Sequence, residues 1–249
     1  MKDVLTAEAS ARAASEISVV VPTYRRGIAL LDTLRHLLEL EPPPGEILVV
    51  DQTEEHPADV AEQLRRMEAA GQVRIIRFSP PSIPCAMNVG LRAARNPVVL
   101  FVDDDVVPAP DLAAAHAARY SKGPAAVCGQ VLQPGETPDP GANRVQRGKG
   151  FRADLDFRFN GIRETDVANV ISCNLSVDRA AALAVGGFDE RFVGSAYRYE
   201  TDFARRLTAA GHRILFAPEA SLRHLRLPMG GTRSQGDHLA RPAPGHAVG

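Results

Sequence analysis

Residues 98–108 read VVLFVDDDVVP, an apolar run of five residues that leads directly into three consecutive carboxylates. A run of β-branched and aromatic residues bounded by polar ones predicts a buried strand over 98–102. Adjacent ionised carboxylates repel one another and lose hydration at the edge of an apolar layer, so Asp103, Asp104 and Asp105 need a compensating cation or very good solvation. The stretch therefore predicts a core strand that ends in a charged site.

Short β-branched runs alternate with helical patterns through the whole first half of the chain. The strand-like runs are 17–21, 47–50, 73–78 and 98–102, and the helical patterns between them are Leu30, Leu34, Leu37 and Leu38, then Val60, Leu64 and Met67, then the Ala-rich stretch 86–94. This order predicts an α/β fold, with a mostly parallel sheet flanked by helices on both faces. Ligands of such sheets gather beyond the carboxyl ends of the strands. We therefore expect one site built from the segments that follow the runs.

The second half is less regular. Residues 133–165 are rich in Gly, Pro and Arg and predict a long loop that orders over a ligand. An extended stretch at 167–177 follows, and Asp178 is placed to N-cap a short helix. A helix from Tyr199 to a stop at Gly211 and two short strands within 212–225 complete the expected elements.

Composition excludes several classes of protein. Lys and Arg number 29 and Asp and Glu 30, for a formal net charge of -1, so no global basic field attracts nucleic acid or anionic lipid. The three cysteines are far apart and form no C-x-x-C pair, which argues against a disulfide framework or a structural zinc site and favours a cytoplasmic location. No apolar run approaches the roughly 18 residues of a membrane span, so we expect at most peripheral membrane contact.

The acidic triplet has three interpretations. In extended chain, Asp103 and Asp105 point to one side and Asp104 to the other, so the D-x-D pair is suited to a hard divalent cation shared with substrate phosphates. A solvated turn before Pro108 is the simplest alternative. The segment FVDDDVV also fits the D-x-D-x-[TV] signature of haloacid-dehalogenase-like phosphatases, but those proteins carry it after their first strand, and here it follows the fourth.

The turn after the first strand, VVVPTYRR (19–26), lacks the G-x-G-x-x-G of a Rossmann dinucleotide site. It offers a hydroxyl, a phenol and two guanidinium groups, which suit a nucleotide and its phosphates, or it is a surface turn with solvated arginines. Asp51, after the second strand, is suited to accept hydrogen bonds from a base or ribose, or to cap its loop.

Taken in order, the segments VVVPTYRR, LVVDQ, VLFVDDD, CNLSVDRAAALAVGGFDERF, YETDFARRL and AGHRILFAPEASLRHL resemble the family-2 inverting glycosyltransferases with a GT-A fold. The resemblance covers about residues 17–228. It implies a single Rossmann-like GT-A domain, with a nucleotide-binding half at 17–105 and an acceptor half at 106–228, between flexible tails at 1–16 and 229–249. The implied reaction moves a sugar, hexosyltransferase-like, from a nucleoside-diphosphate donor of UDP, GDP or dTDP type to a sugar, lipid-linked or small-molecule acceptor.

The resemblance also implies residue roles. It implies nucleotide contacts for Pro22, Thr23, Tyr24, Arg26, Asp51, Asn88, Asp103 and Asp104, and a divalent metal, Mn²⁺ or Mg²⁺, on Asp103, Asp105 and His224. It implies an acceptor or diphosphate loop at Gly187, Phe188 and Asp189, and Glu200 as general base. From the residues themselves, the basic loop Arg144–Arg163 is suited to the acceptor side, and Arg233 is suited to neutralise the diphosphate, or its segment is disordered. Two departures matter. Tyr199-Glu200 stands where the family usually has Glu-Asp, and Met87 stands where it usually has Arg. From the residues alone, His224 is equally a half-buried histidine bonded to backbone.

Helical geometry separates the two acids of the later helix independently of the resemblance. At about 100° per residue, Glu200 lies close to the face of Phe203 and Leu207, whereas Asp202 projects away beside Arg205 and Arg206 at i+3 and i+4. Asp202 therefore has a structural role, and an inward Glu200 is the candidate base. The competing class is a non-catalytic sugar-nucleotide binding protein that kept the donor site and lost the base.

Overall fold

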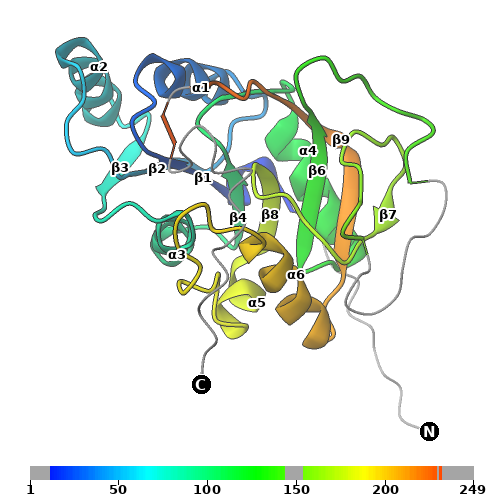
Figure 1. The fold of residues 1–249 in the computed structure, drawn as a ribbon. Coiled ribbons are helices and arrows are strands. Elements are labelled where there is room, and N and C mark those ends of the chain that lie inside the picture. The colour runs from blue at the N-terminus through cyan, green and yellow to red at the C-terminus, as the bar shows by residue number, and fades with distance from the viewer. Residues whose placement is uncertain (1–11, 144–153, 229, 232–249) are drawn as a thin grey trace, which may run out of the picture.

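The computed structural model describes residues 12–143, 154–228 and 230–231, which form a twisted sheet covered by helices on both faces (Figure 1). The strands are β1 (Ile17–Thr23), β2 (Glu46–Asp51), β3 (Arg74–Arg77), β4 (Val98–Val102), β5 (Val106–Pro108), β6 (Ala126–Leu132), β7 (Thr165–Asp166), β8 (Asn174–Asp178) and β9 (Ile214–His224). The helices are α1 (Ile28–Leu38), α2 (Ala58–Ala69), α3 (Ile83–Ala93), α4 (Leu112–Arg119), α5 (Arg179–Ala184) and α6 (Tyr199–Ala209), with short 3₁₀ turns η1 (Ala14–Glu16) and η2 (Tyr120–Lys122). The predicted α/β class and the βαβαβαβ order of the first half are confirmed.

The sheet has the strand order β3-β2-β1-β4-β8-β6-β9-β5, with β7 paired to β9. Strands β1 to β4 run parallel, whereas β8 lies antiparallel between β4 and β6. Parallel strands bring their carboxyl ends to one edge, and an antiparallel neighbour brings its first residues to that same edge. The residues after β1 and β4 and those before β8 are therefore neighbours.

Two apolar layers sandwich the sheet. Val19 and Val21 of β1 pack with α1, α2 and α4 on one face, and Val20 packs with α3, α5 and α6 on the other. All five residues of β4 are buried between the layers. This two-sided burial explains why 98–102 reads as a continuous apolar run rather than an alternating one.

The second half departs from the expected elements in two places. One strand, β9, stands in place of the two expected within 212–225. Its pairing with β6 shifts between Gly129 and Gln130, which leaves a bulge around Pro218 without ending the strand. The extended stretch 167–177 becomes regular strand only from Asn174. The Asp178 cap is confirmed, since its side chain accepts a hydrogen bond from the Ala181 amide at 3.0 Å.

Residues 12–16, which the sequence assigned to a flexible N-terminal tail, pack against the rest of the fold. Ala14 of η1 is buried in the core, and Arg12 pairs with Asp178. At the other end, the Gly231 amide donates to the Tyr24 carbonyl at 2.7 Å, so residues 230 and 231 contact the first turn. Among the described residues, no helix is long and apolar enough to cross a membrane.

Candidate active site

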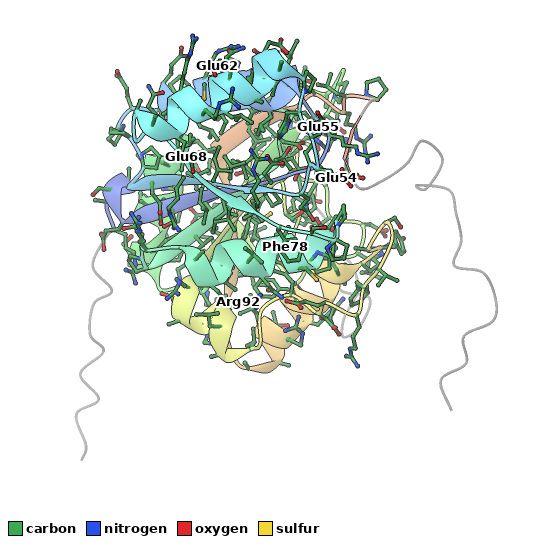
Figure 2. The ribbon with its side chains drawn as sticks, turned by 90° about the vertical axis from the view of Figure 1, so that its left-hand side faces the viewer. Glu54, Glu55, Glu62, Glu68, Phe78 and Arg92 are labelled. Carbon is green, nitrogen blue, oxygen red and sulfur yellow. The ribbon has the colours of Figure 1, made fainter. Side chains whose placement is uncertain are left out.

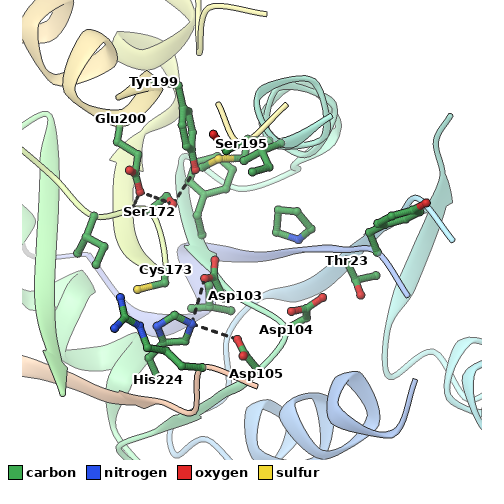
Figure 3. Close-up of a pocket in the computed structure, with 18 of the residues that line it drawn as sticks. Thr23, Asp103, Asp104, Asp105, Ser172, Cys173, Ser195, Tyr199, Glu200 and His224 are labelled. Atoms are coloured by element: carbon green, nitrogen blue, oxygen red, sulfur yellow. Dashed lines mark hydrogen bonds and ion pairs between the residues drawn. The ribbon is translucent and has the colours of Figure 1, made fainter. Parts of the chain in front are cut away.

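A pocket of about 1000 Å³ opens beyond the carboxyl ends of β1 and β4 (Figure 3). It is lined by the turn after β1, the acids after β4, the residues before β8, the start of α6 and the end of β9. Of the predicted site residues, it brings together Pro22, Thr23, Tyr24, Arg26, Asp103, Asp104, Asp105, Glu200 and His224. Met87, the departure noted above, also lines it.

All three acids of the triplet line this pocket, which corrects the expectation that Asp104 turns away. The chain bends after β4 instead of staying extended. Asp104 lies 3.0 Å from the Arg26 Nε, and its burial raises its pKa to about 7 against the opposing charge of Arg26. Asp105 is fully buried and lies 3.5 Å from an Arg26 terminal nitrogen.

His224 is the second basic side chain that faces the triplet. Its Nε2 lies 3.2 Å from Asp105 and 3.5 Å from Asp103, and its Nδ1 bonds to the Gln133 Oε1 at 3.2 Å. Burial alone would lower the pKa of His224, but the interaction with Asp105 and the charges of both acids raise it. Because Oε1 of an amide only accepts, Nδ1 carries the proton and Nε2 is the nitrogen that faces the acids.

Glu200 lies in the first turn of α6 and faces the pocket, as the helical geometry predicted. Its Oε1 accepts from the Ser172 amide at 2.8 Å and from the Ser172 hydroxyl at 2.7 Å. The buried Tyr199 hydroxyl in turn donates to the Ser172 Oγ at 2.7 Å. Both of these hydrogen bonds from Ser172 reach the same oxygen, Oε1, of Glu200 (Figure 3).

Asp202 has the structural role expected for it. Its carboxylate pairs with Arg206 at 2.8 Å, one helical turn away. Arg206 also donates to the carbonyls of Val185 and Gly187 at 2.6 Å each. The pair thus fastens α6 to the loop after α5, and Asp202 does not line the pocket.

Asp51 lies in a neighbouring hollow of about 770 Å³ and not in the main pocket. Its buried carboxylate binds His56 Nε2 at 2.7 Å, accepts from the Thr53 amide at 2.9 Å, and pairs with Arg77. Three further residues that line this hollow, Glu54, Glu55 and Phe78, are labelled in Figure 2. Gln52 lines both spaces, so the two are adjacent.

Asn88 is also outside the pocket. Its amide donates to the Phe188 carbonyl at 2.7 Å and accepts from the Phe188 amide at 2.8 Å, which holds the loop after α5 against α3. Gly187 has φ +67°, and a Cβ there would lie 2.4 Å from the Asn88 Oδ1, so only glycine fits. Asn88 therefore positions this loop, and its amide nitrogen donates to Phe188 and to Glu190.

The predicted acceptor loop lies beside the pocket but does not line it. Phe188 is buried against Phe101 and Phe203, and Asp189 pairs with Arg191, whose hydrogen bonds lower the Asp189 pKa to about 2. Arg233 and residues 144–153 of the basic loop lie outside the described residues.

The pocket-lining residues that sequence reasoning missed include Ser172, Cys173, Ser195, Tyr197 and Arg198. The first two precede β8, and recognising β8 as antiparallel to β4 would have placed them at the same edge. The other three lie in the loop before α6, where Ala196 and Arg198 have positive φ and Tyr197 is 68% exposed with Arg198 against its ring.

The residues present fit a divalent ion. Ligand atoms of Asp103, Cys173 and His224 all lie within 4.8 Å of one another. The Asp105 Oδ1 is buried and, among described residues, lacks a well-aligned hydrogen-bond donor, although His224 Nε2 is 3.2 Å away. A buried carboxylate oxygen beside an imidazole and a second carboxylate is a donor set that suits a cation.

Comparison with known proteins now bears on this geometry. Residues 18–183 match the family model described as glycosyl transferase family 2. The succinoglycan biosynthesis protein ExoM of Rhizobium meliloti (strain 1021) is 28% identical over 208 residues, covering 82% of this chain and 65% of that protein.

Solved structures share the fold. GalNAc-T7 with UDP, GalNAc and Mn²⁺ superposes with a TM-score of 0.68 at 16% identity, covering 88% of this chain and 44% of that one. The mannosyltransferase PcManGT of Pyrobaculum calidifontis, in complex with GDP-Man and Mn²⁺, gives 0.59 at 19% identity over 86% of this chain and 58% of its own. S. aureus TarS 1-349 in complex with UDP-GlcNAc gives a TM-score of 0.66 at 16% identity, covering 87% of this chain and 60% of that one. The chain thus has the GT-A fold and spans at most about two thirds of these relatives' length.

Proposed function

The chain belongs to glycosyl transferase family 2, and from that premise we propose that it transfers a sugar from a nucleoside-diphosphate donor to an acceptor hydroxyl, with inversion at the anomeric carbon. The observation that carries the proposal is the convergence of Glu200 with the acidic triplet and His224 on one pocket. A single displacement needs a base on one side of the sugar and groups that receive a diphosphate on the other.

On the donor side, the turn Pro22–Arg26 and the acids after β4 would hold the nucleotide. The structurally similar proteins were solved with UDP, GDP-Man or UDP-GlcNAc, which supports a nucleotide sugar as the donor class. Asp51 and its hollow adjoin the pocket through Gln52, within reach of a base or ribose that extends beyond the diphosphate. Asn88 is left out of this set because its amide holds Phe188.

Asp103, Asp105 and His224 would hold a divalent ion, Mn²⁺ or Mg²⁺, which would neutralise the diphosphate as it leaves. Two similar structures carry Mn²⁺. Gln133 orients His224 from behind, as an outer-shell partner of a metal-binding histidine does.

Glu200 would act as the base. Its carboxylate takes the proton of the acceptor hydroxyl as that oxygen bonds to the anomeric carbon, and the bond from that carbon to the diphosphate oxygen breaks on the opposite face. Ser172 holds Oε1 with two hydrogen bonds, which fixes the carboxylate. The exposed Tyr197 and its neighbours Ser195 and Arg198 line the remaining rim and would receive the acceptor, in place of the loop at Gly187–Asp189.

The test compares two carboxylates of one helix. Glu200→Gln keeps size and hydrogen bonding but cannot take a proton, so donor binding should persist while turnover falls by roughly 10²–10⁴. Asp202→Asn is the matched control, because it removes only a part-exposed pair with Arg206, typically worth below about 1 kcal/mol. Donor affinity is measured by calorimetry and turnover by nucleoside diphosphate release. Normal turnover in the Gln variant would exclude Glu200 as the base, and loss of turnover with retained structure in the Asn variant would point to Asp202.

A further inference from the structure

The backbone pairing of β4 and β8 places Cys173 beside the acidic triplet. The pair Val102–Asn174 is the last of the antiparallel β4–β8 ladder. Asp103 directly follows β4 and Cys173 directly precedes β8, so the two residues lie side by side just beyond this last pair. His224 reaches the same point from the end of β9, paired there with Val106 of β5.

The surroundings of the thiol differ from those of an ordinary buried cysteine. A free cysteine usually behaves as a small hydrophobe, and Cys173, only 2% exposed, does contact the apolar core. Yet it also lines the pocket, and its sulfur lies within 4.8 Å of a carboxylate oxygen of Asp103 and a ring nitrogen of His224 (Figure 3). Cys128, equally buried, instead directs its thiol at the Ile171 carbonyl.

A second observation points to a cation at this place. Asp105 is 0% exposed, and its Oδ1 lacks a well-aligned donor among the described residues while facing His224. Gln133 fixes the His224 Nδ1, so Nε2 is the ring nitrogen turned toward both acids. Oxygen, nitrogen and sulfur atoms of Asp103, His224 and Cys173, which come from three strand ends, thus lie within 4.8 Å of one another.

We propose that Cys173 is a ligand of this cation site, so that the site binds thiophilic divalent ions such as Co²⁺ and Zn²⁺ through an oxygen, nitrogen and sulfur donor set. The inference rests on the proposed metal role of Asp103, Asp105 and His224 and adds a residue to it. Carboxylate and imidazole alone suit Mn²⁺ and Mg²⁺, whereas a thiolate favours softer ions. The thiol gives up its proton to solvent as the metal–sulfur bond forms.

Two consequences follow for binding. Zn²⁺ and Co²⁺ should bind more tightly than Mg²⁺, in part through sulfur, and should compete with Mn²⁺ for the same place. Removal of the sulfur should lower the affinity for Zn²⁺ by at least about 10-fold, since even outer-shell partners of a metal site typically contribute that much affinity. Mg²⁺, a hard ion that prefers oxygen ligands, should be nearly unaffected.

The experiment is a Co²⁺ titration of the full chain, followed by absorption spectroscopy. We expect a near-ultraviolet sulfur-to-cobalt charge-transfer band in the wild type and in Cys128→Ser, the buried-cysteine control. Cys173→Ser should lose the band and keep the weaker visible bands of cobalt bound to oxygen and nitrogen. Cys173→Ala, with the folding of each variant checked by circular dichroism, covers the case in which a buried serine prevents folding.

A band that survives in the folded Cys173 variants, cobalt binding without any band, or no cobalt binding would each overturn the inference. Calorimetry of nucleoside diphosphate with Mg²⁺ or Mn²⁺ on the same samples separates this failure from that of the proposed function. Metal-dependent nucleotide binding without a sulfur band would remove Cys173 alone. Absence of both would remove the cation site itself.

Discussion

Ser172→Ala tests whether the carboxylate of Glu200 is held for chemistry or merely accommodated. The Ser172 hydroxyl stands between two groups, accepting from Tyr199 and donating to Glu200, at 2.7 Å each. Alanine removes both hydrogen bonds and keeps the backbone amide that donates to Glu200 at 2.8 Å. Glu200 would therefore remain in the pocket with one of its two restraints.

The magnitude follows from these two bonds. A hydrogen bond to a charged group contributes about 1.5–3 kcal/mol, and the lower end applies because Glu200 is only half-buried. The neutral bond from Tyr199 adds about 1 kcal/mol. We expect the free energy of unfolding to fall by about 2.5 kcal/mol. Losing a restraint of about 1.5 kcal/mol on the base corresponds to a roughly 10-fold lower turnover, far milder than the loss expected for Glu200→Gln.

Ser176→Ala is the matched control. Ser176 is also buried and also accepts from a tyrosine, Tyr120, at 3.0 Å, but it binds His116 in the layer between β8 and α4 and does not line the pocket. It should lose comparable stability and keep full turnover per folded molecule. Urea unfolding gives the first quantity, and nucleoside diphosphate release, with water as the acceptor if none is known, gives the second.

The reasoning fails if the folded Ser172→Ala protein turns over at the wild-type rate, because then Oγ does not orient the base. It also fails if Ser176→Ala slows turnover to the same extent, since the effect would then come from loosened packing. Donor affinity should be unchanged in both variants.

Three further outcomes are expected. Chelation of divalent ions should sharply weaken nucleoside diphosphate binding, because Asp103 and Asp105 would then face the phosphates as like charges; equal affinities by calorimetry with and without Mg²⁺ would contradict this. Asp51→Ala should weaken nucleotide binding and leave its metal dependence intact, since Asp51 lies in the adjacent hollow; unchanged affinity would leave Asp51 as the cap of its own loop. Burial lowers the pKa of His116 from 6.5 to about 4, so the unfolded chain takes up a proton at higher pH than the folded chain does. The free energy of unfolding should therefore fall by about 3 kcal/mol as the pH is lowered from 6.5 toward 4. Urea unfolding of His116→Gln should lack this pH dependence.

The first half of the fold could be predicted from the sequence because its signals are local. Runs such as 98–102 are apolar on both faces, and helices α1 to α3 repeat apolar residues at helical spacing. The second half lacks this property. The single long strand β9 depends on a bulge opposite Gly129, and the shortness of β8 depends on what pairs with it, so neither boundary is encoded by a local pattern.

The site residues likewise fall into those that local sequence patterns predict and those that they do not. Residues that directly follow parallel strands, such as Tyr24 and Asp103, could be found from strand order alone. Ser172 and Cys173 could not, because they precede a strand and reach the site only through its antiparallel direction. The family resemblance implied ligand contacts for Asn88 and Phe188, but neither lines the pocket, because the Asn88 amide is hydrogen-bonded to the Phe188 backbone.

The acidic triplet shows most plainly why local reasoning is incomplete. Three adjacent carboxylates require compensation, and the chain itself brings two basic side chains from distant elements, Arg26 after β1 and His224 at the end of β9. The same groups order the segment that follows β9, because Arg26 donates to the Leu227 carbonyl at 2.9 Å and Asp105 accepts from the Leu227 amide at 2.9 Å. A ligand or cation that drew Asp105 or Arg26 to itself would therefore act on this segment as well, since charge neutralisation at the triplet and the position of residues 225–228 depend on the same bonds.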